Sequence, residues 1–90
     1  MIMPQAEAAK IRKSQYLTDE QLEEGVNDAI KYALDKMVSR VEFEIYADDA
    51  TDKQWKELKR KVKKAGYQVL FCGKDYTQTK TMRAIEFLID

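Results

Sequence analysis

The C-terminal stretch Met82–Ile89, with the sequence MRAIEFLI, decides the fold of this 90-residue chain. Successive side chains of a β-strand point to opposite faces, so Ile85 and Phe87 share one face. Ala84 and Leu88 lie on the other, and both faces are therefore largely apolar. A strand that is buried on both faces is usually central in its sheet. The stretch predicts a central strand with a neighbour on either side.

Two further strands are expected upstream of it. Residues 41–46 (VEFEIY) alternate strictly between apolar and polar side chains, which is typical of a strand with one solvent-exposed face, at the edge of a sheet. Residues 67–72 (YQVLFC) form the other strand, and residues 73–80 form a polar loop before the last one. With the last strand central, the spatial order is first, third, second. We expect a mixed sheet, because a right-handed crossover joins the first strand to the second.

Two helices begin with the same local signal. Thr18–Gln21 (TDEQ) and Thr51–Gln54 (TDKQ) both match the capping box, in which a Thr hydroxyl accepts from the third helical N–H and the Gln side chain reaches back. The first signal predicts an amphipathic helix to about Met37, because apolar residues recur at the helical period. The second predicts a helix to Ala65, which Gly66 ends in the left-handed conformation.

Together these elements predict a single α+β domain over residues 1–90. The order is helix, helix, strand, helix, strand, strand, and the expected architecture is a two-layer sandwich of helices on a three-stranded sheet. Residues 1–16 are expected to be a weakly packed N-terminal helix or arm, because residues 4–15 carry no clean apolar stripe. Gly25 interrupts the helix after Thr18 at about 1 kcal/mol relative to Ala. It is either a tolerated surface glycine or a point where the helix closely approaches a strand.

The composition excludes several kinds of chemistry. Hydrophobic residues make up 44% and charged residues 36%, and nothing approaches the roughly 20 apolar residues of a membrane span. There is no histidine, so the usual general base near neutral pH and the commonest zinc ligand are missing. Cys72 is the only cysteine, which excludes an intramolecular disulfide and favours a reducing, cytoplasmic location. We expect no catalytic residue and no cofactor, with Cys72 as a small buried hydrophobe.

Three carboxylates cluster around the start of the second predicted helix, at Asp48, Asp49 and Asp52. Oxygen ligands at such spacing can hold Mg²⁺ or Ca²⁺. Acidic residues in the first turn of a helix also offset the positive end of its dipole. We favour dipole compensation and expect no metal site.

Charge is distributed unevenly along the chain. In total, 16 basic and 16 acidic residues give a net charge of zero. Residues 1–52 hold 6 basic and 12 acidic side chains, whereas residues 53–90 hold 10 and 4. An acidic face and a basic face favour an oppositely charged partner or self-association, and zero net charge weakens the repulsion between copies.

The helix after Thr51 is the strongest candidate for a functional surface. Its basic side chains cover the face opposite Trp55 and Val62, a pattern shared by phosphate-binding surfaces, acidic-partner surfaces and lysine-rich solvated faces. Tyrosine in the loop after residue 73 offers contact area at small entropic cost. The candidate partner-binding residues are Lys53, Lys56, Lys59, Arg60, Lys63, Lys64 and Tyr76.

The stretch Lys53–Phe71 (KQWKELKRKVKKAGYQVLF) follows an amphipathic helix and an alternating strand. In this layout, which covers residues 18–89, the chain resembles small uncharacterised proteins encoded by phages and prophages of Gram-positive bacteria. The resemblance carries no known active-site residue onto this chain. It implies an accessory protein that acts in the host cytoplasm by binding another molecule.

These observations favour a non-enzymatic protein-interaction module. The expected partner is another protein or a second copy of the chain, as a homodimer, bound along the edge of residues 41–46 or through an apolar sheet face that the N-terminal helix leaves uncovered. The alternative is nucleic-acid binding through the lysine-rich helix 52–65. An enzyme would need a carboxylate-only or metal-dependent mechanism. Neither a membrane nor a small-molecule substrate is expected.

Overall fold

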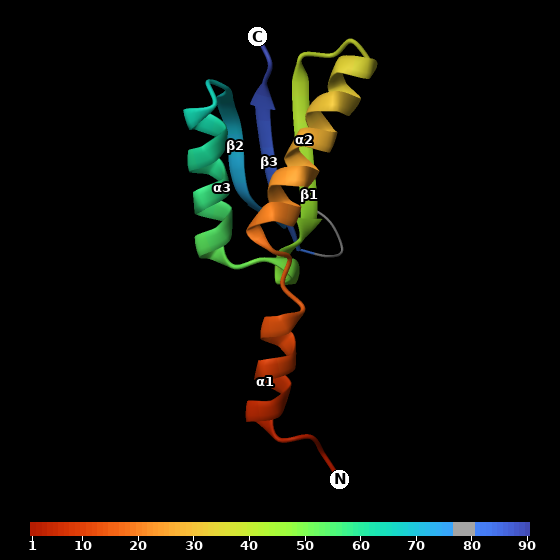
Figure 1. The fold of residues 1–90 in the computed structure, drawn as a ribbon, viewed down its shortest axis with the longest axis vertical. Coiled ribbons are helices and arrows are strands. Elements are labelled where there is room, and N and C mark those ends of the chain that lie inside the picture. Colours follow the sequence, from red (N-terminus) through yellow and green to blue (C-terminus); the bar gives the residue numbers. More distant parts are fainter. Residues whose placement is uncertain (77–80) are drawn as a thin grey trace.

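The computed structural model of the chain describes residues 1–76 and 81–90. It contains both helices and strands (Figure 1), and the predicted α+β class is confirmed. The elements in chain order are α1 Gln5–Ser14, α2 Asp19–Asp35, β1 Arg40–Tyr46, the 3-10 turn η1 Ala47–Asp49, α3 Asp52–Lys64, β2 Gln68–Asp75 and β3 Met82–Leu88.

The three strands form one antiparallel sheet in the order β1-β3-β2. The central position of β3 is confirmed, and it follows from the apolar side chains on both of its faces. The expectation of a mixed sheet is wrong. The connection through α3 does make β1 and β2 run in the same direction, but β3 lies between them and runs opposite to both. No parallel pair of neighbours arises among the described strands.

Strand β2 is longer than predicted. Gly73, Lys74 and Asp75 were expected in the polar loop, but they pair with Ala84, Arg83 and Met82 of β3. The pairing shifts register between Val69 and Phe71, and this irregularity leaves the two adjacent apolar residues, Leu70 and Phe71, both exposed. The rest of the predicted loop, residues 77–80, lies outside the described residues.

Both capping boxes are confirmed. The Thr18 hydroxyl accepts from the Gln21 N–H at 3.1 Å, and the Gln21 side chain accepts from the Thr18 N–H at 2.9 Å. The same two bonds, with the same lengths, join Thr51 and Gln54. Two of the N–H groups that a helix leaves without an internal partner are thereby satisfied at each start.

The ends of α2 and α3 also match each other. Each helix is followed by a residue with positive φ, Met37 at 59° and Gly66 at 104°. The next N–H then bonds back across the last turn, from Val38 to the Ala33 carbonyl and from Tyr67 to the Val62 carbonyl. This is the Schellman arrangement, and it confirms Gly66 as the left-handed stop.

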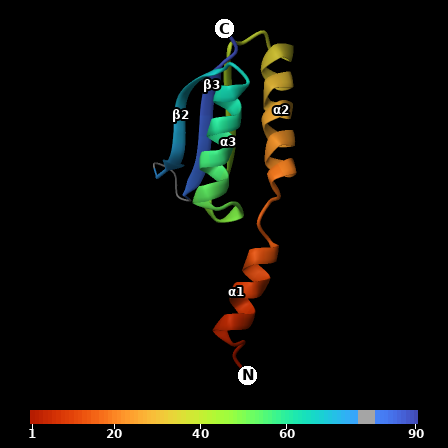
Figure 2. The ribbon, with the colours of Figure 1, turned by 60° about the vertical axis from the view of Figure 1, so that its left-hand side comes forward.

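Helices α2 and α3 lie on the same face of the sheet (Figures 1 and 2). The register places Val41, Phe87 and Val69 side by side on that face. Trp55 of α3 stacks on Phe43 with ring centroids 5.9 Å apart. The buried core comprises Leu22, Val26, Ala33, Val41, Ala50, Trp55, Leu58, Val62, Ile85 and Phe87.

At Gly25, helix α2 lies close to the Phe43 side chain of β1. A Cβ atom at this position would lie 2.4 Å from Cε1 of Phe43. Of the two explanations for this glycine, the close approach to a strand is therefore confirmed.

Helix α1 extends away from the rest of the molecule (Figure 1). Its side chains are exposed wherever they are described. The radius of gyration is 15.1 Å, against about 12 Å for a compact chain of this length. The protruding helix accounts for this difference.

Candidate functional site

The basic residues of α3 divide between three sides of the helix. Lys61 turns toward α2 and forms an ion pair with Glu23 at 3.3 Å. Lys53, Arg60 and Lys64 point outward to solvent, away from the buried Trp55 side. Arg60 is held there by an ion pair with Glu57, three residues earlier.

The remaining side of α3 faces β2 and forms a groove of about 480 Å³. Its floor is formed by Trp55, Cys72 and Gly73. The complete lining comprises Asp52, Trp55, Lys56, Lys59, Cys72, Gly73, Lys74, Tyr76 and Arg83. We call this the basic groove.

The basic groove brings together three of the predicted partner-binding residues, Lys56, Lys59 and Tyr76. Tyr76 is 71% exposed at its rim. Lys63 is exposed but is not part of the groove lining. Lys53, Arg60 and Lys64 lie on the outward side of α3, away from the groove. The predicted set is therefore not one continuous site.

Two groove residues, Lys74 and Arg83, were missed by sequence reasoning. They are register partners on β2 and β3. Both belong to the sheet face that carries the core, one step beyond Cys72 and Ile85. Strand geometry places residues 72 and 74, and residues 83 and 85, on one face. The sequence does not indicate this for residue 74, because the segment 73–80 is typical of a polar loop.

Arg83 and Asp52 form the electrostatic centre of the groove. The Arg83 side chain is 8% exposed and lies 2.6 Å from the Asp52 carboxylate. Its Nε donates to the Ala47 carbonyl at 2.8 Å. The hydrogen bond and charge of Arg83, with the nearby charge of Lys74, lower the pKa of Asp52. The buried guanidinium is therefore paired, as a buried charge must be.

The groove nevertheless keeps an excess of positive charge. Four cationic side chains, Lys56, Lys59, Lys74 and Arg83, line the groove together with one carboxylate, that of Asp52. Asp52 engages Arg83 closely and Lys74 only at 3.9 Å. The lysine ammonium groups remain available to an anionic ligand, because one carboxylate balances only one of the four charges.

The predicted carboxylate cluster separates in the structure. Asp48 and Asp49 lie in η1, whereas Asp52 is the first residue of α3 and turns to Arg83. Across residues 1–76 and 81–90, no three His, Cys, Asp or Glu side chains form a metal-binding group. Asp52 occupies the position at which a carboxylate offsets the helix dipole.

Cys72 lies half-buried in the floor of the basic groove. Burial raises the pKa of its thiol, while the charges of Lys59 and Lys63 act in the opposite direction with smaller effect. The thiolate is the nucleophilic form of cysteine. Cys72 is therefore a neutral thiol near pH 7.

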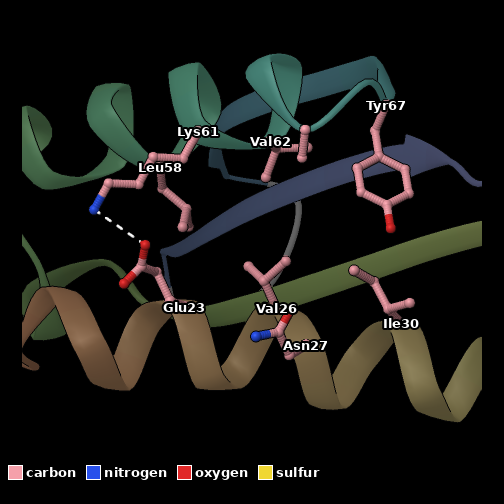
Figure 3. Close-up of a pocket in the computed structure, with 9 residues that line it drawn as sticks. Glu23, Val26, Asn27, Ile30, Leu58, Lys61, Val62 and Tyr67 are labelled. Atoms are coloured by element: carbon pink, nitrogen blue, oxygen red, sulfur yellow. Dashed lines mark ion pairs between the residues drawn. The ribbon is translucent and has the colours of Figure 1, made fainter.

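A second groove, of about 440 Å³, lies between α2 and α3 (Figure 3). Its floor is apolar, and the Tyr67 ring closes one end, where it contacts Phe87 with centroids 5.0 Å apart. The Lys61–Glu23 ion pair bridges the two helices at the rim. The lining comprises Glu23, Val26, Asn27, Ile30, Leu58, Lys61, Val62, Ala65 and Tyr67. We call this the interhelical groove.

The sheet face opposite the helices carries both charged and apolar side chains. Arg40 forms ion pairs with Glu86 and Glu42. Phe71 of β2 is the register partner of Glu86 and lies close to Gly73, where a Cβ would be 3.8 Å from the Phe71 ring. Strand β1 is an edge strand, as predicted. None of the described helices has the length and hydropathy to cross a membrane.

Comparison with protein-family models, with curated proteins and with solved structures gave no match.

Proposed function

We propose that the protein is a non-enzymatic interaction module that binds an acidic segment of a protein partner in the basic groove. The observation that carries this proposal is the imbalance of four cationic side chains against one carboxylate around the groove. Lysine ammonium groups attract carboxylates as flexible point charges. A segment of a partner protein that is rich in glutamate or aspartate fits that surface.

The composition of the groove supports binding in preference to catalysis. Its only thiol is Cys72, whose pKa is raised by burial, and the chain has no histidine to activate it. Tyr76 at the rim supplies contact area next to the lysines. Cys72 and Gly73, both partly exposed, supply a floor against which an extended peptide packs.

Decaglutamate labelled with fluorescein tests the proposal by fluorescence anisotropy. We expect binding at about 0.1 M salt, where the Debye length is about 10 Å, and loss of binding at about 1 M salt, where it is about 3 Å. The triple variant Lys56→Glu, Lys59→Glu and Lys74→Glu should weaken binding by at least about tenfold.

A matched control separates the groove from net charge. The triple variant Lys10→Glu, Lys31→Glu and Lys36→Glu changes the net charge by the same amount on exposed residues of α1, of α2 and of its C-cap. We expect its affinity to stay within about twofold of the wild type, because distant exposed charges are screened. Equal losses in both variants would refute a specific site in the groove.

Nucleic acid is the second candidate ligand, and the position of Tyr76 favours it. Proteins that bind single strands combine a cationic groove with exposed aromatic rings on which bases stack. A thymidine decamer in the same assay measures this alternative. Tighter binding of the decamer than of decaglutamate, lost in Tyr76→Ala, would select nucleic acid over an acidic protein.

The proposed cellular role follows from the resemblance in layout to phage and prophage proteins of Gram-positive bacteria. In this proposal, the chain is an accessory protein that acts in the host cytoplasm. Its partner is then a host or phage protein with an acidic surface segment.

A further inference from the structure

Helices α2 and α3 carry opposite charges of equal size. The α2 span Asp19–Asp35 contains six acidic residues and one basic residue. The α3 span Asp52–Lys64 contains seven basic and two acidic residues. Both helices lie on the same face of the sheet and run side by side (Figure 2). One surface of the molecule therefore has an acidic half next to a basic half.

Most of the outward charges on this surface have no intramolecular partner among the described side chains. The Lys61–Glu23 ion pair is the link that joins the helices within that part of the chain. On α2, Glu20, Glu24, Asp28 and Asp35 are exposed without an ion pair to another described residue. Lys53 and Lys64 of α3 are exposed in the same way. These charges favour an oppositely charged surface outside the molecule.

Apolar side chains lie between the two charged halves. Ile30 lines the interhelical groove, and Leu34, four residues later, continues the same side of α2. Leu34 is 58% exposed. A surface that covers the groove would bury these side chains at about 25 cal/mol per Å² of apolar area.

We propose that two copies of the chain pack helix face to helix face about a two-fold axis that runs along the helices, between α2 and α3. This rotation places α2 of one copy on α3 of the other, and α3 on α2, so both contacts join opposite charges. A two-fold axis across the helices would instead place α2 on α2. The interface is isologous, because the same patch serves both copies.

Charge complementarity and the interhelical groove both favour a second copy of the chain as the partner on this surface. The acidic half and the basic half of one surface are equal in size and opposite in sign, so a second copy of the chain carries the complementary charges. The two interhelical grooves face each other across the axis, so Ile30 and Leu34 of both copies are shielded from water. This inference goes beyond the proposed ligand, since it uses the outward residues of α3 and not the basic groove.

Analytical ultracentrifugation of two charge-swapped variants tests the arrangement, because it measures the dimer dissociation constant. One variant carries Glu24→Lys and Asp28→Lys on α2, and the other carries Lys53→Glu and Lys64→Glu on α3. Each variant alone places like charges opposite each other in both contacts, so its dimer dissociation constant should rise at least about tenfold. An equimolar mixture should restore the dimer, because the substituted side chains of one variant then meet outward side chains of opposite charge on the other.

The control is Glu44→Lys, which changes an exposed charge on the opposite sheet face. It should leave the dissociation constant within about twofold of the wild type, as expected for an exposed residue outside the interface. Leu34→Asp, on the groove, should weaken the dimer, and circular dichroism checks that each variant is folded.

Two results would overturn the inference. One is a wild type that stays monomeric at about 0.1 M salt, where exposed charges still attract over about 10 Å. The other is a mixture of the two swapped variants that associates no better than either variant alone. Decaglutamate binding by the Lys53→Glu and Lys64→Glu variant reports on the basic groove separately, so failure of the dimer and failure of the proposed ligand are distinguishable.

Discussion

Met37 and Gly66 occupy the same left-handed position after α2 and α3, with a methionine in one and a glycine in the other. The left-handed conformation costs a non-glycine residue about 1–2 kcal/mol. Met37 is 93% exposed, so its side chain contributes no packing. Nothing lies within 4 Å of a Cβ built on Gly66, so strain there is conformational and not steric.

We therefore expect Met37→Gly to raise the free energy of unfolding by about 1 kcal/mol, and Gly66→Ala to lower it by a similar amount. Urea denaturation followed by circular dichroism measures both. The two variants act as each other's control, because they exchange the same conformational preference. Shifts of the same sign would contradict the assignment.

Gly25 should resist substitution for a different reason. Alanine gains about 1 kcal/mol of helix propensity over glycine, but its Cβ would meet the Phe43 ring. That ring stacks on Trp55, so a shift away from the new methyl group would disturb this contact. We expect Gly25→Ala to lower the free energy of unfolding by about 1–2 kcal/mol.

The double variant Gly25→Ala with Phe43→Leu provides the check. Its loss of stability should be smaller than the sum of the two single losses, because the smaller side chain removes the clash. A neutral or stabilising Gly25→Ala would show that α2 is not pressed against β1 at this residue.

The ion pair between Asp52 and Arg83 predicts that the stability of the fold depends on pH. Arg83 lowers the pKa of Asp52 in the folded chain. A lowered pKa stabilises the fold at pH values above the usual pKa of aspartate, about 3.9, and the stabilisation is lost as pH falls through the lowered value. Asp52→Asn should unfold more easily than the wild type at pH 7, and the two should converge in acid.

Thermal denaturation from pH 7 downward measures that difference. Asp48→Asn is the matched control, since Asp48 is exposed and makes no ion pair with another described residue. A gap between Asp52→Asn and the wild type that stays constant into strong acid would contradict the role of this carboxylate.

At the scale of elements, local chemistry was enough to predict the helix boundaries. The capping boxes and the Gly66 stop depend on a few adjacent residues, and they form as the sequence indicates. The central position of β3 followed from its two apolar faces. Strand direction and the end of β2 were mispredicted, because both depend on pairing with β3. Gly, Lys and Asp have low strand propensity, so residues 73–75 appear as a loop until the partner strand is present.

Helix α1 contributes little to the stability of the fold. A helix of 10 residues is marginal by itself in water, and the described side chains of α1 are exposed. The body begins at Leu17, whose N–H donates to the Asp49 carbonyl at 2.8 Å and whose carbonyl accepts from Gln54 at 2.8 Å.

Deletion of residues 1–14 should therefore change the free energy of unfolding by less than about 0.5 kcal/mol. Urea denaturation of the full and shortened chains measures this directly. A loss of several kcal/mol, about the cost of removing a packed apolar side chain, would show that α1 packs on the body.

At the scale of the whole molecule, a chain of zero net charge forms one helical surface with an acidic half on α2 and a basic half on α3. Part of the site was predictable, since a lysine-rich helix is visible in the sequence. The groove itself was not, because Asp52 and Arg83 are 31 residues apart and meet only through the sheet. The same is true of Lys74, which the register of β2 and β3 brings to the groove.

Binding of an acidic segment between α3 and β2 is the central claim, and amide chemical shifts test it most directly. Decaglutamate is titrated into ¹⁵N-labelled protein at about 0.1 M salt, where exposed charges interact over about 10 Å. The account predicts that the largest shifts fall on Lys56, Lys59, Gly73 and Lys74. Shifts centred on α2 or spread evenly over every lysine, or no shifts at all, would contradict it.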